Sequence, residues 1–169
     1  NGATVTVNGI YISGNRMTIG ASGTTGTLTI NAGGAVYNQP YEFYLCEGNG
    51  GTAVVNVAGS LYTGGVDIGL ASSGSATINV LPGGLVANSG RLIFNRGAAF
   101  DGPLAIVISI GGSYRAQGIW DLAGYVSSGK IQAAAGATLV VTTVGSVTTF
   151  TAAALPPKAT SPSPSIGNT

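Results

Sequence analysis

Charged residues are rare in this sequence. Only 7% of its 169 residues are charged, six Lys and Arg against five Asp and Glu, which leaves a net charge of +1. This is too little charge to neutralise a run of phosphates or to hold an anionic membrane surface, so we expect no nucleic acid partner. Solubility therefore depends on Thr, Ser, Asn and the 29 Gly.

Histidine is absent and Cys46 is the only cysteine. An internal disulfide and a Cys/His metal site are therefore excluded, and we expect no cofactor. The longest apolar run, 104–110, falls far short of the roughly 20 residues that a membrane-spanning helix needs, so no membrane span is expected. Because no charged and then apolar leader opens the sequence, we expect Asn1 to follow a processed or trimmed start.

A repeat dominates what is present. Alternating segments end at Val7, Ile30, Val57 and Val80, positions that are spaced by 23, 27 and 23 residues. This is the period of one β-helix coil. Alternation predicts that these four residues form an inward ladder, while the Thr and Asn positions between the apolar ones face outward.

Two more short strands follow in each repeat. The second side is predicted after a corner glycine, and the third leads into a turn rich in Gly, Ser and Asn. The segments are 10–12, 35–37, 60–62 and 85–87 for the second side and 17–20, 43–46, 66–69 and 91–94 for the third. Three strands per coil predict an all-β fold, a short three-sided right-handed parallel β-helix. A β-sandwich or antiparallel barrel does not require this unit to recur in one order.

The repeat phase is expected to end near Ala98, after which the apolar segments are longer. We therefore expect regular β-helix rungs over 1–97 and irregular C-terminal rungs or cap strands over 98–151. The remainder, 152–169, is rich in Pro, Ser and Thr, a composition typical of an extended tail with little intrinsic order.

Two stretches carry a resemblance to a known class of proteins. The residues from Ile19-Gly20-Ala21 to Gly34 and from Ile68-Gly69-Leu70 to Gly84 resemble the Gly/Thr-rich coils of autotransporter-type passenger β-helices and related bacterial surface proteins. The resemblance implies an extracellular location or the bacterial cell surface. It implies little about activity, because such coils occur in proteins of many functions.

Catalytic groups are few. Glu42 and Asp67 are predicted to be diagonal neighbours on the third side, about 7 to 8 Å apart, a spacing that fits an inverting glycosidase. The alternative is that they form ion pairs in the wall, with Arg16 beside Glu42 and Arg91 near Asp67. We favour the ion pairs and predict that the protein is not an enzyme.

Two outward surfaces of the coils remain candidates for binding. Outward Thr and Asn columns on the first side resemble the threonine array of ice-binding solenoids, although Val54 interrupts them and Thr and Asn also suit exposed strands. Aromatic residues cluster on the other two sides, where Phe43 is assigned to the core. The candidate contact surface for a glycan or protein consists of Tyr37, Tyr41, Tyr44 and Tyr62 with Cys46.

The ends of the solenoid are the leading candidates for association. The first strand begins by Thr4, which leaves no room for a cap, and an uncovered strand edge is a template for another strand. The candidate assembly edges are Thr4, Val5, Thr6 and Val7 at one end and Leu139, Val140, Val141, Val147 and Phe150 at the other. We therefore predict a self-associating extracellular structural subunit that forms a homo-polymer, either a fibre or a surface layer. The alternative is a monomeric adhesin fragment that binds a glycan or another cell-surface ligand.

Overall fold

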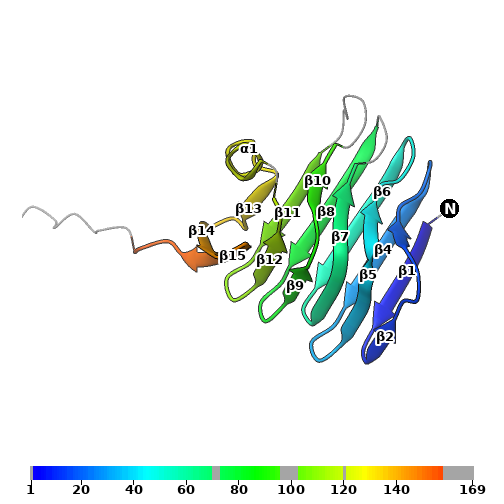
Figure 1. Ribbon diagram of the computed structural model, residues 1–169, viewed down its shortest axis with the longest axis horizontal. Helices are drawn as coiled ribbons and strands as arrows, with labels where there is room; N and C mark the ends of the chain where they lie inside the picture. The colour runs from blue at the N-terminus through cyan, green and yellow to red at the C-terminus, as the bar shows by residue number, and fades with distance from the viewer. Residues whose placement is uncertain (1, 70–72, 96–102, 120, 158–169) are drawn as a thin grey trace, which may run out of the picture.

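The computed structural model describes residues 2–69, 73–95, 103–119 and 121–157. It is 61% strand and 4% helix, and its parallel coils stack into a β-solenoid of about five turns. Figure 1 shows the coils side by side, from the amino-terminal strand at one end to helix α1 (Leu122–Ser127) near the other. The predicted all-β parallel solenoid is therefore confirmed.

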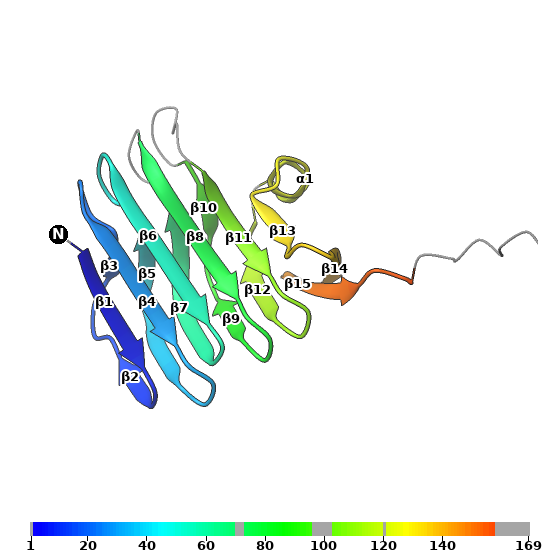
Figure 2. The same cartoon turned by 180° about the vertical axis from the view of Figure 1, so that it is seen from behind.

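The first side of every coil belongs to one six-stranded sheet, which faces the viewer in Figure 2. Its strands, in spatial order, are β1 (Gly2–Val7), β4 (Thr25–Ile30), β6 (Gly51–Val57), β8 (Gly74–Val80), β11 (Leu104–Ile108) and β13 (Ile131–Ala133). The register aligns Val7, Ile30, Val57 and Val80 with one another, and all four are buried. The predicted inward ladder is confirmed, and Ile108 extends it into the next coil.

The second and third sides form one bent sheet. In the first and fourth coils the two sides are separate strands, whereas in the second and third coils a single strand runs through both, with a register shift between Asn38 and Glu42. The strands are β2 (Ile10–Ile12), β3 (Met17–Ile19), β5 (Ala35–Leu45), β7 (Ser60–Ile68), β9 (Leu85–Asn88), β10 (Leu92–Phe94) and β12 (Ser113–Gln117). The core lies between this sheet and the first.

An inward polar residue stabilises the bend between the second and third sides. It recurs every 25 residues, as Ser13, Asn38, Thr63 and Asn88, and all four are buried. Asn38 and Asn88 donate to the backbone carbonyls of Glu42 and Arg91, and Thr63 donates to that of Gly65. Because strand neighbours cannot satisfy backbone groups at a bend, side chains from the interior supply their partners. None of the predictions from the sequence included this ladder.

The corner between the first and second sides is a four-residue turn. Gly34 donates to the carbonyl of Asn31, and Gly33 adopts a φ of 82°, the left-handed value that a type II turn requires at its third position. The same turn recurs at Ser109–Gly112, with Gly111 at 83°. The fifth coil therefore keeps the repeat on its first two sides, and the predicted loss of phase comes too early. Ala98 itself lies outside the described residues.

The chain closes the solenoid with a helix and a hairpin. Asp121 accepts a hydrogen bond from the Gly124 backbone at the start of α1, and β13 adds the last strand of the first sheet. The strands β14 (Ala137–Val144) and β15 (Val147–Ala154) then pair with each other, and β15 also pairs antiparallel with β12. The predicted tail thus starts later than residue 152, and most of it lies outside the residues that the structure describes.

Candidate functional site

The tyrosines on the bent sheet are the first candidate contact surface. The rings of Tyr37 and Tyr62 are adjacent in one outward column and stack with centroids 4.8 Å apart and planes 9° apart. Tyr37 and Tyr41 are exposed, and Tyr62 is half-buried. Two stacked rings on a strand surface offer flat apolar area with polar edges, as sugar and protein contacts require. The structure therefore brings together two of the predicted contact residues, Tyr37 and Tyr62.

Tyr44 and Cys46 are not part of an accessible surface. Tyr44 is 7% exposed, because the Arg16 guanidinium lies over its ring at 5.0 Å from the centroid. Cys46 is fully buried and has a φ of 58°, so the corner turns its side chain inward, where the thiol contacts the Gly51 carbonyl. Burial also raises the pKa of this thiol. The prediction that both residues contribute to contacts is therefore wrong, because Arg16 covers Tyr44 and because simple alternation does not hold at the left-handed corner of Cys46.

The carboxylates of the third side lie against arginines. Arg91 Nη2 is 3.2 Å from Asp67 Oδ2 and 3.5 Å from Glu42 Oε1. Arg16 pairs with Glu47 at 3.2 Å, and not with Glu42 as expected. One guanidinium thus lies against both candidate catalytic carboxylates, an arrangement that fits ion pairs in the wall. Within the described residues no cluster of three potential ligands could hold a metal ion, and no helix is long and apolar enough to cross a membrane.

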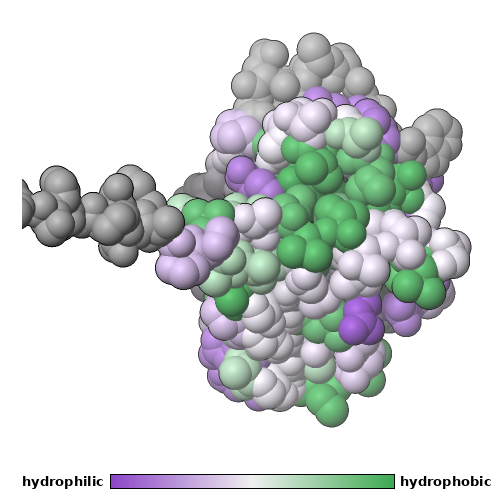
Figure 3. Space-filling view, turned by 90° about the vertical axis from the view of Figure 1, so that its left-hand side faces the viewer, coloured by the Kyte–Doolittle hydropathy of each residue, from purple (hydrophilic) through white to green (hydrophobic). Residues whose placement is uncertain are grey.

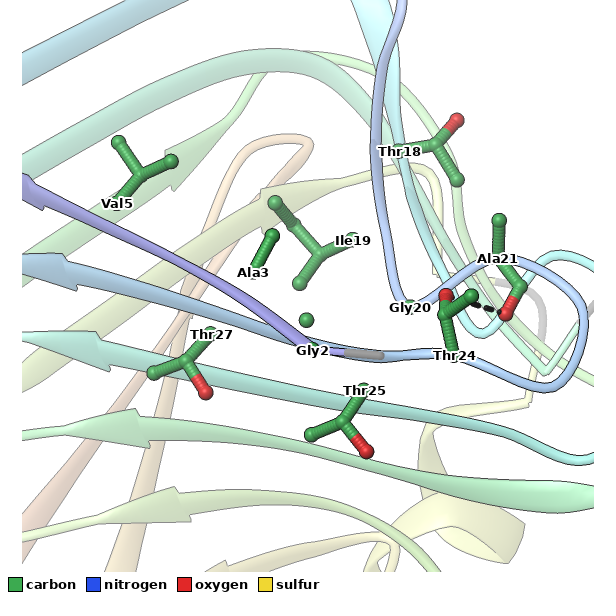
Figure 4. Close-up of a pocket in the computed structure, with 11 residues that line it drawn as sticks. Gly2, Ala3, Val5, Thr18, Ile19, Gly20, Ala21, Thr24, Thr25 and Thr27 are labelled. Carbon is green, nitrogen blue, oxygen red and sulfur yellow. Dashed lines mark hydrogen bonds between the residues drawn. The ribbon is translucent and has the colours of Figure 1, made fainter.

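The amino-terminal end exposes the cross-section of the core. Val5 and Tyr11 are inward residues of the first coil, aligned with buried Leu28 and Val36 of the second, yet they are 49% and 46% exposed. Val5 also lines a recess of about 360 Å³. Ala3, Val5 and Ile19 line this recess together with Thr25 and Thr27, and Figure 4 shows Ile19 beside Ala3. Apolar side chains and the edge of β1 that pairs with no described strand therefore lie on one surface.

The carboxyl-terminal end differs from the predicted one. Val147 and Phe150 belong to β15, which lies between β14 and β12, and Phe150 is fully buried. These two residues are therefore not a free assembly edge. Leu139, Val140 and Val141 do lie on an edge strand, β14, and Val140 and Val141 are each 40% exposed. Figure 3 shows that hydrophobic residues gather on this end of the molecule.

The sequence contains a signal for the hairpin at this end. Gly145 and Ser146 separate two alternating β-branched runs, and a two-residue loop with glycine first is a hairpin signature. Both runs were interpreted as strands that reach another molecule, although this loop indicates that they pair with each other.

Comparison with known proteins gives no relative. No protein-family model, no curated protein and no solved structure matches the chain. The features of the molecule that can indicate a function are therefore its two ends and the wall between them.

Proposed function

We propose that this protein is an extracellular structural subunit whose copies stack end to end into a fibre or surface layer. The observation that carries the proposal is the first coil, whose inward residues Val5 and Tyr11 are about half exposed. Their counterparts one coil later are 1% and 0% exposed, so one further layer is enough to bury them. A second copy supplies that layer when its own apolar end meets this one.

Stacking explains the geometry better than exchange of terminal strands. The hairpin strands β14 and β15 are paired over their full lengths, and β15 is also paired with β12. Donating either strand to a neighbour would break these backbone hydrogen bonds, whereas stacking breaks none. The edges of β1 and β13, at opposite ends of the same six-stranded parallel sheet, are free to meet among the described strands. Their pairing would continue that sheet from one copy into the next.

The residues at the two ends also indicate that association between copies does not require charge. Val5, Ile10, Tyr11 and Ile12 at one end and Leu139, Val140 and Val141 at the other carry no charge. Assembly through backbone bonds and apolar contacts is only weakly screened by salt. We therefore expect association that increases with protein concentration and persists at high salt. The extracellular or bacterial surface location rests on the resemblance of the coils to surface proteins.

A proline substitution tests the edge directly. The Asn31 amide donates to the Val7 carbonyl, so the backbone groups of Val7 face β4. Neighbouring residues of a parallel strand point their groups to opposite sides, so those of Thr6 face the open edge. Thr6→Pro removes an edge donor without breaking a bond to β4, a position where proline is tolerated. We expect this variant to fold with an unchanged circular dichroism spectrum but to stay monomeric in sedimentation velocity.

A second pair of variants separates the end from the wall. Val5→Lys places a charge in the exposed core at the amino-terminal end, whereas Ile110→Lys places one at a corner turn of the fifth coil. The two wild-type side chains are similarly exposed, at 49% and 50%. Val5→Lys should abolish the particles seen by negative-stain microscopy, and Ile110→Lys should leave them intact. A wild-type protein that is monomeric at all concentrations, or a Thr6→Pro variant that assembles normally, would overturn end-to-end stacking.

A further inference from the structure

A shallow groove crosses the wall of the solenoid at the fourth coil. Its floor is formed by Ala87 and Ser89 at and just beyond the end of β9, and it has a volume of about 170 Å³. The long side chains of Arg115 and Gln117 line it from β12, and Gln39 lines it from the opposite side. Figure 1 places β9 between β7 and β12. The groove exists because Ala87 and Ser89 are small, whereas Arg115 and Gln117 of the fifth coil and Gln39 of the second coil have long side chains.

The groove lies next to the column of stacked tyrosines, at the coil after Tyr62, which does not itself line the groove. The register places Tyr37, Tyr62, Ala87 and Arg115 at equivalent outward positions of four successive coils. One face of the Tyr62 ring packs against Tyr37. On its other side the next position is Ala87, whose methyl group is too short to cover a ring. Two strand spacings, roughly 10 Å, separate the Tyr62 position from that of Arg115, which leaves room for one ring between them.

Arg115 is a cation without a carboxylate partner in the part of the chain that the structure describes. The two other arginines there are both paired, Arg16 with Glu47 and Arg91 with Asp67 and Glu42. Arg115 is exposed beside the groove. A guanidinium binds a carboxylate through two parallel hydrogen bonds, and Gln39 and Gln117 offer amide donors and acceptors for hydroxyl groups.

We propose that this groove binds a carboxylate-bearing sugar unit of an acidic glycan. The sugar ring lies over Ala87 with its apolar face toward Tyr62, its carboxylate pairs with Arg115, and its hydroxyls bond to the two glutamines. Sites of this kind combine an apolar platform with a few polar groups that fix orientation. The groove is on the wall and not at either end, so this binding is independent of end-to-end stacking, and an assembled fibre would present one groove per subunit.

The test is calorimetric titration with a uronic acid oligosaccharide and with the same oligosaccharide after reduction of its carboxyl groups. The acidic form should bind and the reduced form should bind at least about tenfold more weakly, because it cannot form the paired hydrogen bonds with Arg115. Equal affinity for the two forms, or no binding of the acidic form, would overturn the proposal.

Matched variants locate the site. Arg115→Gln should weaken binding of the acidic form by about tenfold, whereas Arg16→Gln removes the same charge from another face and should leave it unchanged. Ala87→Leu fills the groove and should abolish binding, whereas Ala105→Leu adds the same volume on the outward face of the six-stranded sheet and should not. Thermal melts check that all four fold. Retained binding in Arg115→Gln or Ala87→Leu contradicts this site. Retained binding in Thr6→Pro shows that the groove acts independently of assembly.

Discussion

The two ends of this solenoid finish the same kind of coil in different ways. At the amino-terminal end the first coil pairs with a described coil on one side only, and its inward residues Val5 and Tyr11 are about half exposed. At the other end an antiparallel hairpin covers the fifth coil, so that Tyr114 and Phe150 are fully buried with ring centroids 6.1 Å apart. The change from parallel to antiparallel pairing stops the repeat and closes the core.

The difference between the two ends shows that the direction of a side chain and its burial are separate properties in a stacked fold. Alternation along a strand decides which residues point inward, and the neighbouring coil decides whether they are buried. Val5 and Leu28 point the same way in adjacent strands, yet their exposed fractions are 49% and 1%. Because the stability of a solenoid is approximately a sum of contacts between neighbouring coils, equal substitutions should have unequal effects at its two ends.

The largest effect is expected in the closing hairpin. Phe150→Ala removes a fully buried ring from contact with Tyr114 and should lower the free energy of unfolding by about 3 to 5 kcal/mol. Val144→Ala, in the same hairpin at 76% exposure, is the control and should change it by less than about 0.5 kcal/mol. Urea denaturation followed by circular dichroism measures both. Equal effects would mean that the hairpin does not belong to the cooperative unit.

The next prediction compares two residues of one inward column, one in the first coil and one in the second. Leu28→Ala should cost about 2 to 5 kcal/mol, whereas Val5→Ala in the neighbouring strand should cost less than about 1 kcal/mol because water already reaches that side chain. At low protein concentration, the difference between these two costs in unfolding free energy describes the isolated subunit. If the cost of Val5→Ala rises with protein concentration, a second copy covers the end. A large cost at every concentration would contradict an open first coil.

A smaller effect is expected in the polar ladder at the bend. Thr63→Val deletes a hydroxyl that donates to the Gly65 carbonyl at 2.9 Å inside the third coil, and should cost about 1 to 3 kcal/mol because the buried carbonyl loses its partner. Ser13→Ala deletes the equivalent hydroxyl, which donates to Asn15, in the first coil. Water can replace that bond at the open end, so its cost should be smaller. If Ser13→Ala lowers the free energy of unfolding as much as Thr63→Val does, the first coil is not more open to water than the third.

The regular coils could be predicted from the sequence because two short-range signals coincide in them. Strict alternation identified the inward ladder, and the recurring three-strand unit placed 43–46 and 66–69 on the same side of successive coils, which the register confirms. The fifth coil was harder to recognise, because 28 residues separate Val80 from Ile108 instead of the 23 or 27 found earlier. The pair Gly111 and Gly112, which matches Gly33 and Gly34, still marked its corner.

Other features could not be predicted from alternation alone. Cys46 turns inward because its backbone adopts a left-handed conformation at a corner where the equivalent residues include Gly20 and Gly69. The groove at Ala87 depends on the sizes of side chains in three successive coils, and so requires the register across coils and not only the pattern within one. The sequence predicts Arg91 near Asp67, whereas the second contact of Arg91, with Glu42, depends on the register across coils for the same reason.

The last prediction uses alkaline pH to examine the closed end. Burial raises the pKa of Tyr114 above its ordinary value of 10.0, so above pH 10 the unfolded chain ionises this phenol while the folded protein keeps it neutral. The folded state therefore binds more protons, and stability falls as pH rises, by at most about 1.4 kcal/mol per pH unit from this group. Urea midpoints should decrease above pH 10 in the wild type and decrease less steeply in Tyr114→Phe. Below pH 9 the pKa shift contributes nothing to stability, so the two proteins should differ only by a pH-independent amount. If both decline alike at alkaline pH, Tyr114 ionises as readily in the folded protein as in the unfolded one, and the hairpin does not exclude water from the fifth coil.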